Sequence, residues 1–180
     1  EVTPQHLWVH APEVYEKWGT FAQINPPIRE KRHQQALLKG LLNIFPKVVT
    51  WASDNPGKTH SLPLTTRQQL LRALVEDIDH PKLEMVQNLS SPWAITTLER
   101  AESQWSKSSL FFVIGSDLTG QIISWRQVED VLKKATIGIA IRDGWPISDS
   151  HLKDIEFLGG IIDLLPLKIP ASSSSIIRER

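Results

Sequence analysis

Residues 110–117 read Leu-Phe-Phe-Val-Ile-Gly-Ser-Asp, an apolar run that ends in a glycine and two short polar side chains. Such a run predicts a buried parallel strand that stops at a tight turn and opens a helix, with Ser116 or Asp117 as the helix cap. In open α/β sheets, ligands bind beyond the carboxyl ends of the strands. The turn formed by Gly115, Ser116 and Asp117 is therefore a candidate binding site.

Apolar and amphipathic segments alternate on both sides of this run. The apolar segments predict strands over residues 48–52, 83–86, 110–114, 136–141 and 161–165. The amphipathic segments predict helices over residues 29–45, 66–77, 95–105, 126–134 and 149–158. Successive β-α units of this kind predict an α/β, Rossmann-like fold: a parallel sheet of five or six strands with helices on both faces.

The length of the chain fits one domain, and neither a linker nor an internal repeat divides it. We therefore expect a single domain over residues 1–180. Residues 1–27 contain no clear central strand, so we expect this end to be irregular or reorganised. Because the sequence starts at Glu1 and stops at Arg180, one turn into an expected helix, we also expect a truncated C-terminus.

The composition argues against several classes of function. Lys+Arg and Asp+Glu both number 20, so the formal net charge is +0 and no overall charge attracts nucleic acid. The absence of cysteine excludes disulfides, thiolate metal sites and a cysteine nucleophile. No apolar run approaches the roughly 18 to 20 residues that a membrane span needs. We expect a cytoplasmic protein with no nucleic-acid or membrane partner and no metal-ligating cluster of its own.

A second candidate binding site lies near the end of the chain. Residues 169–178 read Ile-Pro-Ala-Ser-Ser-Ser-Ser-Ile-Ile-Arg, an apolar strand end followed by four serines and an arginine. Serines can cap a helix start, whose open N–H groups bind anions, and an arginine one turn later can hold the same anion. The pattern predicts a phosphate site that contains Ser173, Ser174, Ser175 and Arg178. A disordered serine-rich tail is the alternative.

Five motifs between residues 48 and 178 follow the order and rough spacing of one protein family. They are Trp-Ala-Ser-Asp-Asn-Pro-Gly-Lys at 51–58, Phe-Val-Ile-Gly-Ser-Asp-Leu at 112–118, Trp125, Arg-Asp-Gly at 142–144, and Ser-Ser-Ser-Ile-Ile-Arg at 173–178. On these residues the chain resembles the nicotinate-nucleotide adenylyltransferase family, in its cyanobacterial-type form, within the nucleotidyltransferase superfamily.

The resemblance implies adenylyl transfer from ATP to nicotinate mononucleotide, which gives a dinucleotide and pyrophosphate in NAD biosynthesis. It implies ATP and a pyridine mononucleotide as partners, Mg²⁺ as the cofactor that accompanies ATP, and it leaves room for a homo-oligomer. Two other functions stay open. The chain could be a catalytically degenerate family member that acts as a nucleotide-binding regulatory or structural subunit, or it could use a different phosphate acceptor.

The resemblance also implies roles for individual residues. The implied catalytic residues are His33, Lys58 and Arg178, which would neutralise charge on the phosphates. The implied substrate-binding residues are Thr20, Trp93, Gly115, Asp117, Trp125, Arg142, Ser173, Ser174 and Ser175.

Two regions depart from the family pattern. The family signature Gly-Thr-Phe-Asp-Pro-x-His-x-Gly-His is reduced here to Gly-Thr-Phe at 19–21 and His33, with Arg32 in place of the last glycine. An arginine there opposes the close approach of backbone to phosphate that glycine permits. In the mononucleotide pocket, Trp93 supplies an aromatic ring, but Ala94 lacks the hydroxyl that the family offers to the nicotinate carboxylate. The first departure favours the degenerate alternative, and the second leaves the acceptor open.

Overall fold

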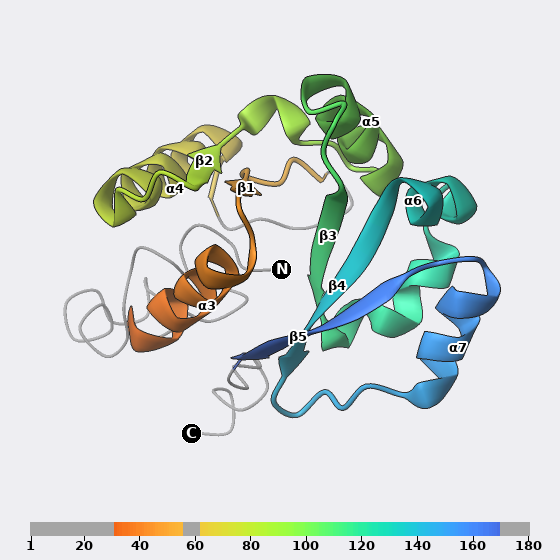
Figure 1. The fold of residues 1–180 in the computed structure, drawn as a ribbon. Helices are drawn as coiled ribbons and strands as arrows, with labels where there is room; N and C mark the ends of the chain where they lie inside the picture. Colours follow the sequence, from red (N-terminus) through yellow and green to blue (C-terminus); the bar gives the residue numbers. More distant parts are fainter. Residues whose placement is uncertain (1–30, 56–61, 170–180) are drawn as a thin grey trace. The chain divides into compact units, whose positions relative to one another are not determined.

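The computed structural model describes residues 31–55 and 62–169, and the side chains of residues 38–55 and 62–167. The chain divides into two compact units, whose boundary in the sequence lies between Ser90 and Ser91. Each unit contains a parallel sheet with helices packed on it (Figure 1). No helix in the described part of the chain is long and apolar enough to cross a membrane.

The unit before residue 91 packs helices against a two-stranded parallel sheet. Its elements are α3 (Lys31–Ile44), β1 (Val48–Thr50), α4 (Leu64–Ile78), β2 (Leu83–Met85) and the 3-10 helix η2 (Gln87–Leu89). β1 and β2 pair in register, with Val48 opposite Leu83. Apolar side chains from α3, α4 and the segment after β1 form the buried core of this unit: Leu38, Ala52, Leu71 and Leu74.

The unit after residue 90 is built on a three-stranded parallel sheet. Its strands β3 (Leu110–Gly115), β4 (Ala135–Arg142) and β5 (Ile162–Ile169) lie side by side in that order (Figure 1). Its helical elements are α5 (Ala94–Gln104), the 3-10 helix η3 (Ser116–Ser124), α6 (Val128–Lys134) and α7 (Asp149–Phe157). The register places Gly115 opposite Ala140, so the carboxyl ends of β3 and β4 lie together.

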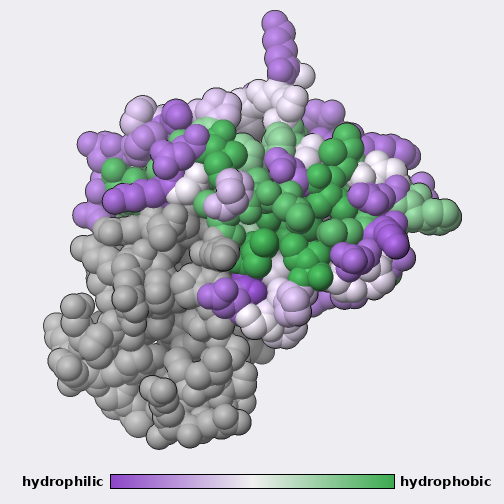
Figure 2. Space-filling view, turned by 60° about the horizontal axis from the view of Figure 1, so that its bottom comes forward, coloured by the Kyte–Doolittle hydropathy of each residue, from purple (hydrophilic) through white to green (hydrophobic). Residues whose placement is uncertain are grey.

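One face of the three-stranded sheet is covered by helices. A buried cluster joins β3 and β4 to η3, α6 and α7, and its members are Ile114, Ile122, Leu132, Ile137, Ile139 and Ile155. Side chains alternate between the two faces along a strand, so Phe111 and Val113 point to the other face, where they are exposed. Figure 2 shows apolar residues exposed at the surface of the described part of the chain.

The sequence-based fold class is confirmed, because the five predicted strands and the five predicted amphipathic helices between residues 29 and 165 have counterparts in the structure, and all described strand pairs are parallel. The five described strands form a two-stranded and a three-stranded sheet rather than one continuous sheet. The single domain over residues 1–180 and the truncated C-terminus stay predictions. Residues 1–27 lie outside the described part of the chain.

One local prediction, the helix cap after β3, is wrong. The segment after β3 is a 3-10 helix, its N-cap is Gly115, and no side chain caps it. Ser116 and Asp117 do not act as caps because both side chains bond to residues at the end of β4 and in the turn that follows.

Candidate nucleotide-binding site

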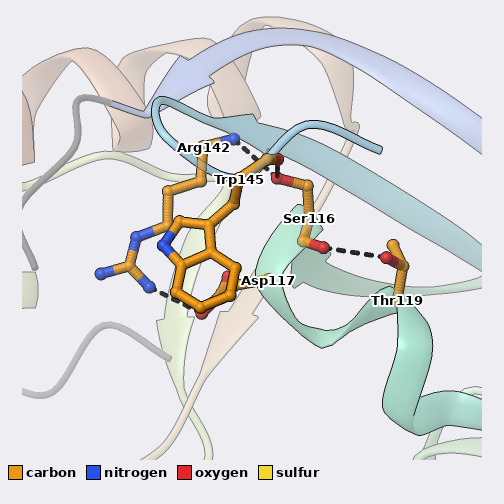
Figure 3. Close-up of polar contacts among 5 residues, drawn as sticks. All are labelled: Ser116, Asp117, Thr119, Arg142 and Trp145. Atoms are coloured by element: carbon orange, nitrogen blue, oxygen red, sulfur yellow. Dashed lines mark hydrogen bonds and ion pairs between the residues drawn. The ribbon is translucent and has the colours of Figure 1, made fainter. Parts of the chain in front are cut away.

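The carboxyl ends of β3 and β4 are joined by one buried hydroxyl. Ser116 is only 4% exposed, and its Oγ donates a hydrogen bond to the carbonyl oxygen of Trp145 at 2.7 Å. The same Oγ accepts a hydrogen bond from the backbone N–H of Arg142 at 3.0 Å. Thr119 Oγ1 donates to the carbonyl oxygen of Ser116 at 2.9 Å, which fixes the first turn of η3 (Figure 3). Ser116 therefore holds the turn after β4 against the turn after β3.

An ion pair lies beside this hydroxyl. Arg142 Nη1 donates to Asp117 Oδ2 at 2.6 Å, and the two side chains are 13% and 17% exposed. The second carboxylate oxygen, Asp117 Oδ1, is buried and accepts no hydrogen bond from the residues that the structure describes. A carboxylate oxygen without a partner still has the capacity to accept a hydrogen bond, for example from a ligand hydroxyl.

Gly115 makes room for this arrangement. A Cβ atom built at position 115 would collide with Oδ1 of Asp117. Any other residue at position 115 would therefore force the carboxylate of Asp117 to move. The glycine of the sequence motif thus has a local reason that does not depend on a ligand.

The turn after β4 presents an aromatic ring that no sequence motif marked as a site residue. The N–H of Trp145 donates to the carbonyl oxygen of Arg142 at 3.0 Å, and Gly144 has a φ of 80°, which closes a tight turn. The indole of Trp145 is 48% exposed and projects from the edge that carries Asp117 and Arg142 (Figure 3). Its only sequence signal was the Gly-Trp-Pro stretch at 144–146, which indicates a loop.

A second aromatic group lies where α5 begins and η3 ends. Trp93 precedes α5 and is 47% exposed, while Trp125 follows η3 and meets Phe112 edge to face, with ring centroids 5.7 Å apart. Ala94 and Trp125 pack against one buried cluster that contains Ile95. Trp93 thus has a partly exposed ring, whereas Trp125 has a packing role in addition to any contact with a ligand.

Arg126 lies over Trp93. The guanidinium carbon of Arg126 is 5.3 Å from the centre of the Trp93 ring, which is within the range of a cation–π contact. Arg126 directly follows Trp125 in the sequence and is exposed. No sequence motif singled out this arginine.

In the other unit, the segment after β1 is held by the side chain of Gln87. The N–H of Ala52 donates to Gln87 Oε1 at 2.9 Å, and Gln87 Nε2 donates to the carbonyl oxygen of Ala52 at 2.7 Å. The N–H of Asp54 donates to Ser90 Oγ at 3.0 Å. These bonds fix the first half of the motif at 51–58.

Arg67 bonds to the backbone at one residue within this motif and at one residue after it. Its side chain is only 3% exposed, its Nε donates to the carbonyl oxygen of Leu62 at 3.1 Å, and its Nη1 donates to the carbonyl oxygen of Ser53. A buried guanidinium needs such partners because an unpaired buried charge is strongly unfavourable. Arg67 and Gln87 position this segment, and neither belongs to a motif.

The structure describes only some of the predicted site residues. Gly115, Asp117 and Arg142 lie together, and Trp93 and Trp125 lie in the aromatic group. His33 belongs to the first turn of α3 as described, but its side chain lies outside the described residues. The remaining predicted residues lie outside the described part of the chain: Thr20, Lys58, Ser173, Ser174, Ser175 and Arg178. Residues 31–55 and 62–169 contain no group of three or more His, Cys, Asp or Glu side chains arranged to hold a metal ion.

Comparisons with known proteins point to one family, although no family model matches the chain. A probable nicotinate-nucleotide adenylyltransferase of Synechocystis sp. is 32% identical over 177 residues, which cover 90% of this chain and 86% of that protein. A protein of the same name from Saccharopolyspora erythraea is 23% identical over 127 residues, which cover 68% of this chain and 58% of that protein.

Two solved structures resemble the fold. Plasmodium falciparum nicotinic acid mononucleotide adenylyltransferase complexed with NaAD aligns with a TM-score of 0.56 at 16% identity, over 85% of this chain and 71% of that chain. The same enzyme complexed with APC aligns with a TM-score of 0.52 at 16% identity, over 78% of this chain and 67% of that chain. At this identity the likeness concerns the fold.

Proposed function

We propose that this chain, which belongs to the nicotinate-nucleotide adenylyltransferase family, transfers the adenylyl group of ATP to nicotinate mononucleotide and releases pyrophosphate. The observation that carries the proposal within the structure is the meeting of Gly115, Asp117 and Arg142 at the carboxyl ends of adjacent parallel strands. Nucleotides bind at this edge in open α/β sheets. The family assignment supplies the reaction.

The reaction is an in-line displacement at the α-phosphorus of ATP. The 5′-phosphate oxygen of the mononucleotide forms a bond to this phosphorus, and the bond to the β-phosphate oxygen breaks, so that pyrophosphate leaves. Such a reaction needs no covalent intermediate on the protein. Catalysis depends on positioning the two phosphates and on neutralising their charge.

Asp117 is the proposed ligand group at the strand ends. Its buried Oδ1 has no hydrogen-bond partner among the residues that the structure describes, and a ribose hydroxyl is a donor of the kind that it lacks. Arg142 is then a positioning residue, because the 2.6 Å bond to Asp117 Oδ2 fixes the carboxylate. This role differs from a direct nucleotide contact, which the sequence motif favoured for Arg142.

The phosphate contacts are proposed for residues whose side chains lie outside the described part of the chain. Lys58 and Arg178 supply positive charge, Thr20 supplies a hydroxyl, and His33 supplies a ring N–H at the start of α3. Ser173, Ser174 and Ser175 would add N–H and hydroxyl donors at a helix start. ATP would enter as its Mg²⁺ complex, since Mg²⁺ is usually bound through substrate phosphates together with one or two carboxylates.

The test measures pyrophosphate release from Mg²⁺-ATP with nicotinate mononucleotide as acceptor. We expect turnover by the unmodified protein and much slower turnover by His33→Ala. Arg178→Ala should weaken ATP binding about 10- to 150-fold, because a charge-assisted contact is worth about 1.5 to 3 kcal/mol. An unmodified protein that binds ATP but turns over neither nicotinate nor nicotinamide mononucleotide would contradict the proposed reaction.

That last outcome would favour the second candidate, a nucleotide-binding subunit without catalysis. Arg32 in place of the family's glycine is the observation that supports it. Calorimetry with ATP separates the two candidates, since both bind the nucleotide and only the enzyme releases pyrophosphate.

A further inference from the structure

We propose that Arg126 selects the acid form of the acceptor by binding the carboxylate of nicotinate mononucleotide. This inference rests on the proposed function and names the residue that would distinguish nicotinate from nicotinamide. It starts from the contact between Arg126 and Trp93, which is 5.3 Å from guanidinium carbon to ring centre. Both residues belong to the unit after residue 90.

Trp93 is suited to hold a pyridine ring. Its indole is 47% exposed, although a large apolar side chain gains free energy from burial. A flat ring that stacks on the part of the indole that Arg126 leaves exposed would remove this surface from water and gain stacking energy. The base of the acceptor is such a ring, and it carries its carboxylate on the ring edge.

Arg126 can bind that carboxylate without leaving Trp93. A guanidinium contacts an aromatic ring through its planar face, whereas its five N–H groups point outward in the plane of the group. A face-on contact with Trp93 leaves the edge of Arg126 able to donate two parallel hydrogen bonds to a carboxylate. Within residues 31–55 and 62–169, no Asp or Glu side chain forms an ion pair with Arg126.

Ala94 explains why a cation is needed at this place. The family pattern places a hydroxyl next to the aromatic position, and the side chain of Ala94 has no donor. Trp93 and Ala94 are adjacent at the start of α5, and Arg126 lies over Trp93. The guanidinium is therefore a charged donor that contacts the same short segment from which the neutral donor is missing.

The same geometry disfavours the amide. A carboxylate offers two acceptor oxygens and a negative charge to the guanidinium. A carboxamide offers one acceptor oxygen, and its NH₂ group would face the N–H groups of Arg126 donor to donor. Arg126 therefore raises affinity for the acid and leaves the amide with at most one of the two bonds.

The experiment compares the unmodified protein with Arg126→Gln, Arg126→Lys and Arg100→Gln. Arg100 lies on α5 and is exposed, so its substitution removes the same charge from the same unit but leaves the guanidinium over Trp93 in place. For each protein, kcat/KM is measured with nicotinate and with nicotinamide mononucleotide at saturating Mg²⁺-ATP. Calorimetry measures the Kd of both mononucleotides independently of turnover.

We expect Arg126→Gln to lower the acid-to-amide ratio of kcat/KM and of affinity about 10- to 100-fold, with the loss confined to the acid. Arg126→Lys should retain part of the preference because it keeps the charge without the planar fork. The KM for ATP should stay unchanged in all variants, and Arg100→Gln should behave like the unmodified protein.

Three results would overturn the inference. The first is an unchanged acid-to-amide ratio of kcat/KM in Arg126→Gln. The second is an equal loss of kcat/KM for both mononucleotides in that variant. The third is a change of the ratio in Arg100→Gln as large as that in Arg126→Gln. If both mononucleotides bind with an affinity ratio that depends on Arg126 but neither is turned over, the proposed reaction is contradicted and the role of Arg126 in binding is supported. Binding of neither mononucleotide by the unmodified protein would overturn both.

Discussion

Ser116 donates its hydroxyl proton to the carbonyl oxygen of Trp145 across 29 residues of sequence, at 2.7 Å. The bond joins the residue after β3 to the turn after β4. Because the same oxygen accepts the N–H of Arg142, one small side chain sets the distance between the two strand ends. The position of Asp117 relative to Arg142 depends on that distance.

Ser116→Ala should therefore destabilise the protein and weaken nucleotide binding. The substitution leaves a buried N–H and a carbonyl group without their partner, and we expect a loss of about 2 to 4 kcal/mol in the free energy of unfolding. Denaturant unfolding measures it. Ser124→Ala is the matched control, because Ser124 is exposed and its hydroxyl donates to the nearby carbonyl oxygen of Gln121 at 2.7 Å. Equal stability changes in the two variants would contradict the role of Ser116.

The ion pair between Asp117 and Arg142 should be worth more than a surface ion pair. With side chains 13% and 17% exposed, Arg142→Met leaves a poorly solvated carboxylate without its cation. We expect a loss of about 2 to 4 kcal/mol in the free energy of unfolding and an increase in the KM for ATP. In a double-mutant cycle with Asp117→Asn, the coupling energy should be about 1 to 3 kcal/mol.

A comparison pair lies in α6. Lys133 and Asp130 are 3.5 Å apart, with side chains 69% and 50% exposed. Lys133→Met should change the free energy of unfolding by less than about 0.5 kcal/mol, because water screens exposed charges. A coupling energy below about 0.5 kcal/mol between Asp117 and Arg142, as expected for an exposed ion pair, would mean that Arg142 does not hold the carboxylate.

The helices and strands could be predicted because their signals are local. Apolar runs and amphipathic periodicity lie within each segment, and the observed bounds differ from the expected ones by at most a few residues. β5 is the exception: the prediction stopped at residue 165, where Pro166 interrupts the run, but the strand continues to Ile169. A register shift between Ala140 and Ile141 accommodates this part of the pairing with β4.

The side chains that build the site could be predicted only in part. Gly115, Asp117 and Arg142 belong to motifs, so their importance was visible in the sequence. Gln87, by contrast, bonds to Ala52 across 35 residues, and nothing local to either residue signals the contact. Likewise, the contact of Arg126 with Trp93 depends on how α5 and η3 pack. Such partners are set by tertiary structure, which periodicity does not encode.

Arg67→Met should loosen the segment that precedes Lys58. The substitution keeps most of the apolar stem of this buried side chain but removes its bonds to the carbonyl oxygens of Ser53 and Leu62. We expect a loss of about 2 to 4 kcal/mol in the free energy of unfolding. Arg72→Met on the exposed side of α4 is the control and should be nearly neutral. Amide hydrogen exchange at residues 51–55 should be faster in Arg67→Met than in Arg72→Met and the unmodified protein. Equal exchange in the three proteins would contradict the role of Arg67.

Ala94→Thr should improve use of nicotinate mononucleotide. We expect turnover by the unmodified protein to be detectable but poor, because the acceptor pocket lacks the family's hydroxyl. A restored donor to a charged group should raise kcat/KM about 5- to 150-fold, since such a hydrogen bond is worth about 1 to 3 kcal/mol. The measurement is pyrophosphate release with nicotinate and with nicotinamide mononucleotide.

Ala94→Val separates the hydroxyl from the volume, because valine has nearly the shape of threonine without the donor. Ala94 is partly buried against the cluster that contains Ile95, so both substitutions add similar bulk beside that core. A gain in kcat/KM in Ala94→Thr that is absent in Ala94→Val assigns the effect to the hydrogen bond.

Ala94→Thr should also act in the Arg126→Gln background. There it should restore part of the lost preference for the acid, because both donors bind the same carboxylate. Equal activity of the proteins with Ala, Thr and Val at position 94 would mean that this position does not face the acceptor. The carboxylate would then have to be bound elsewhere.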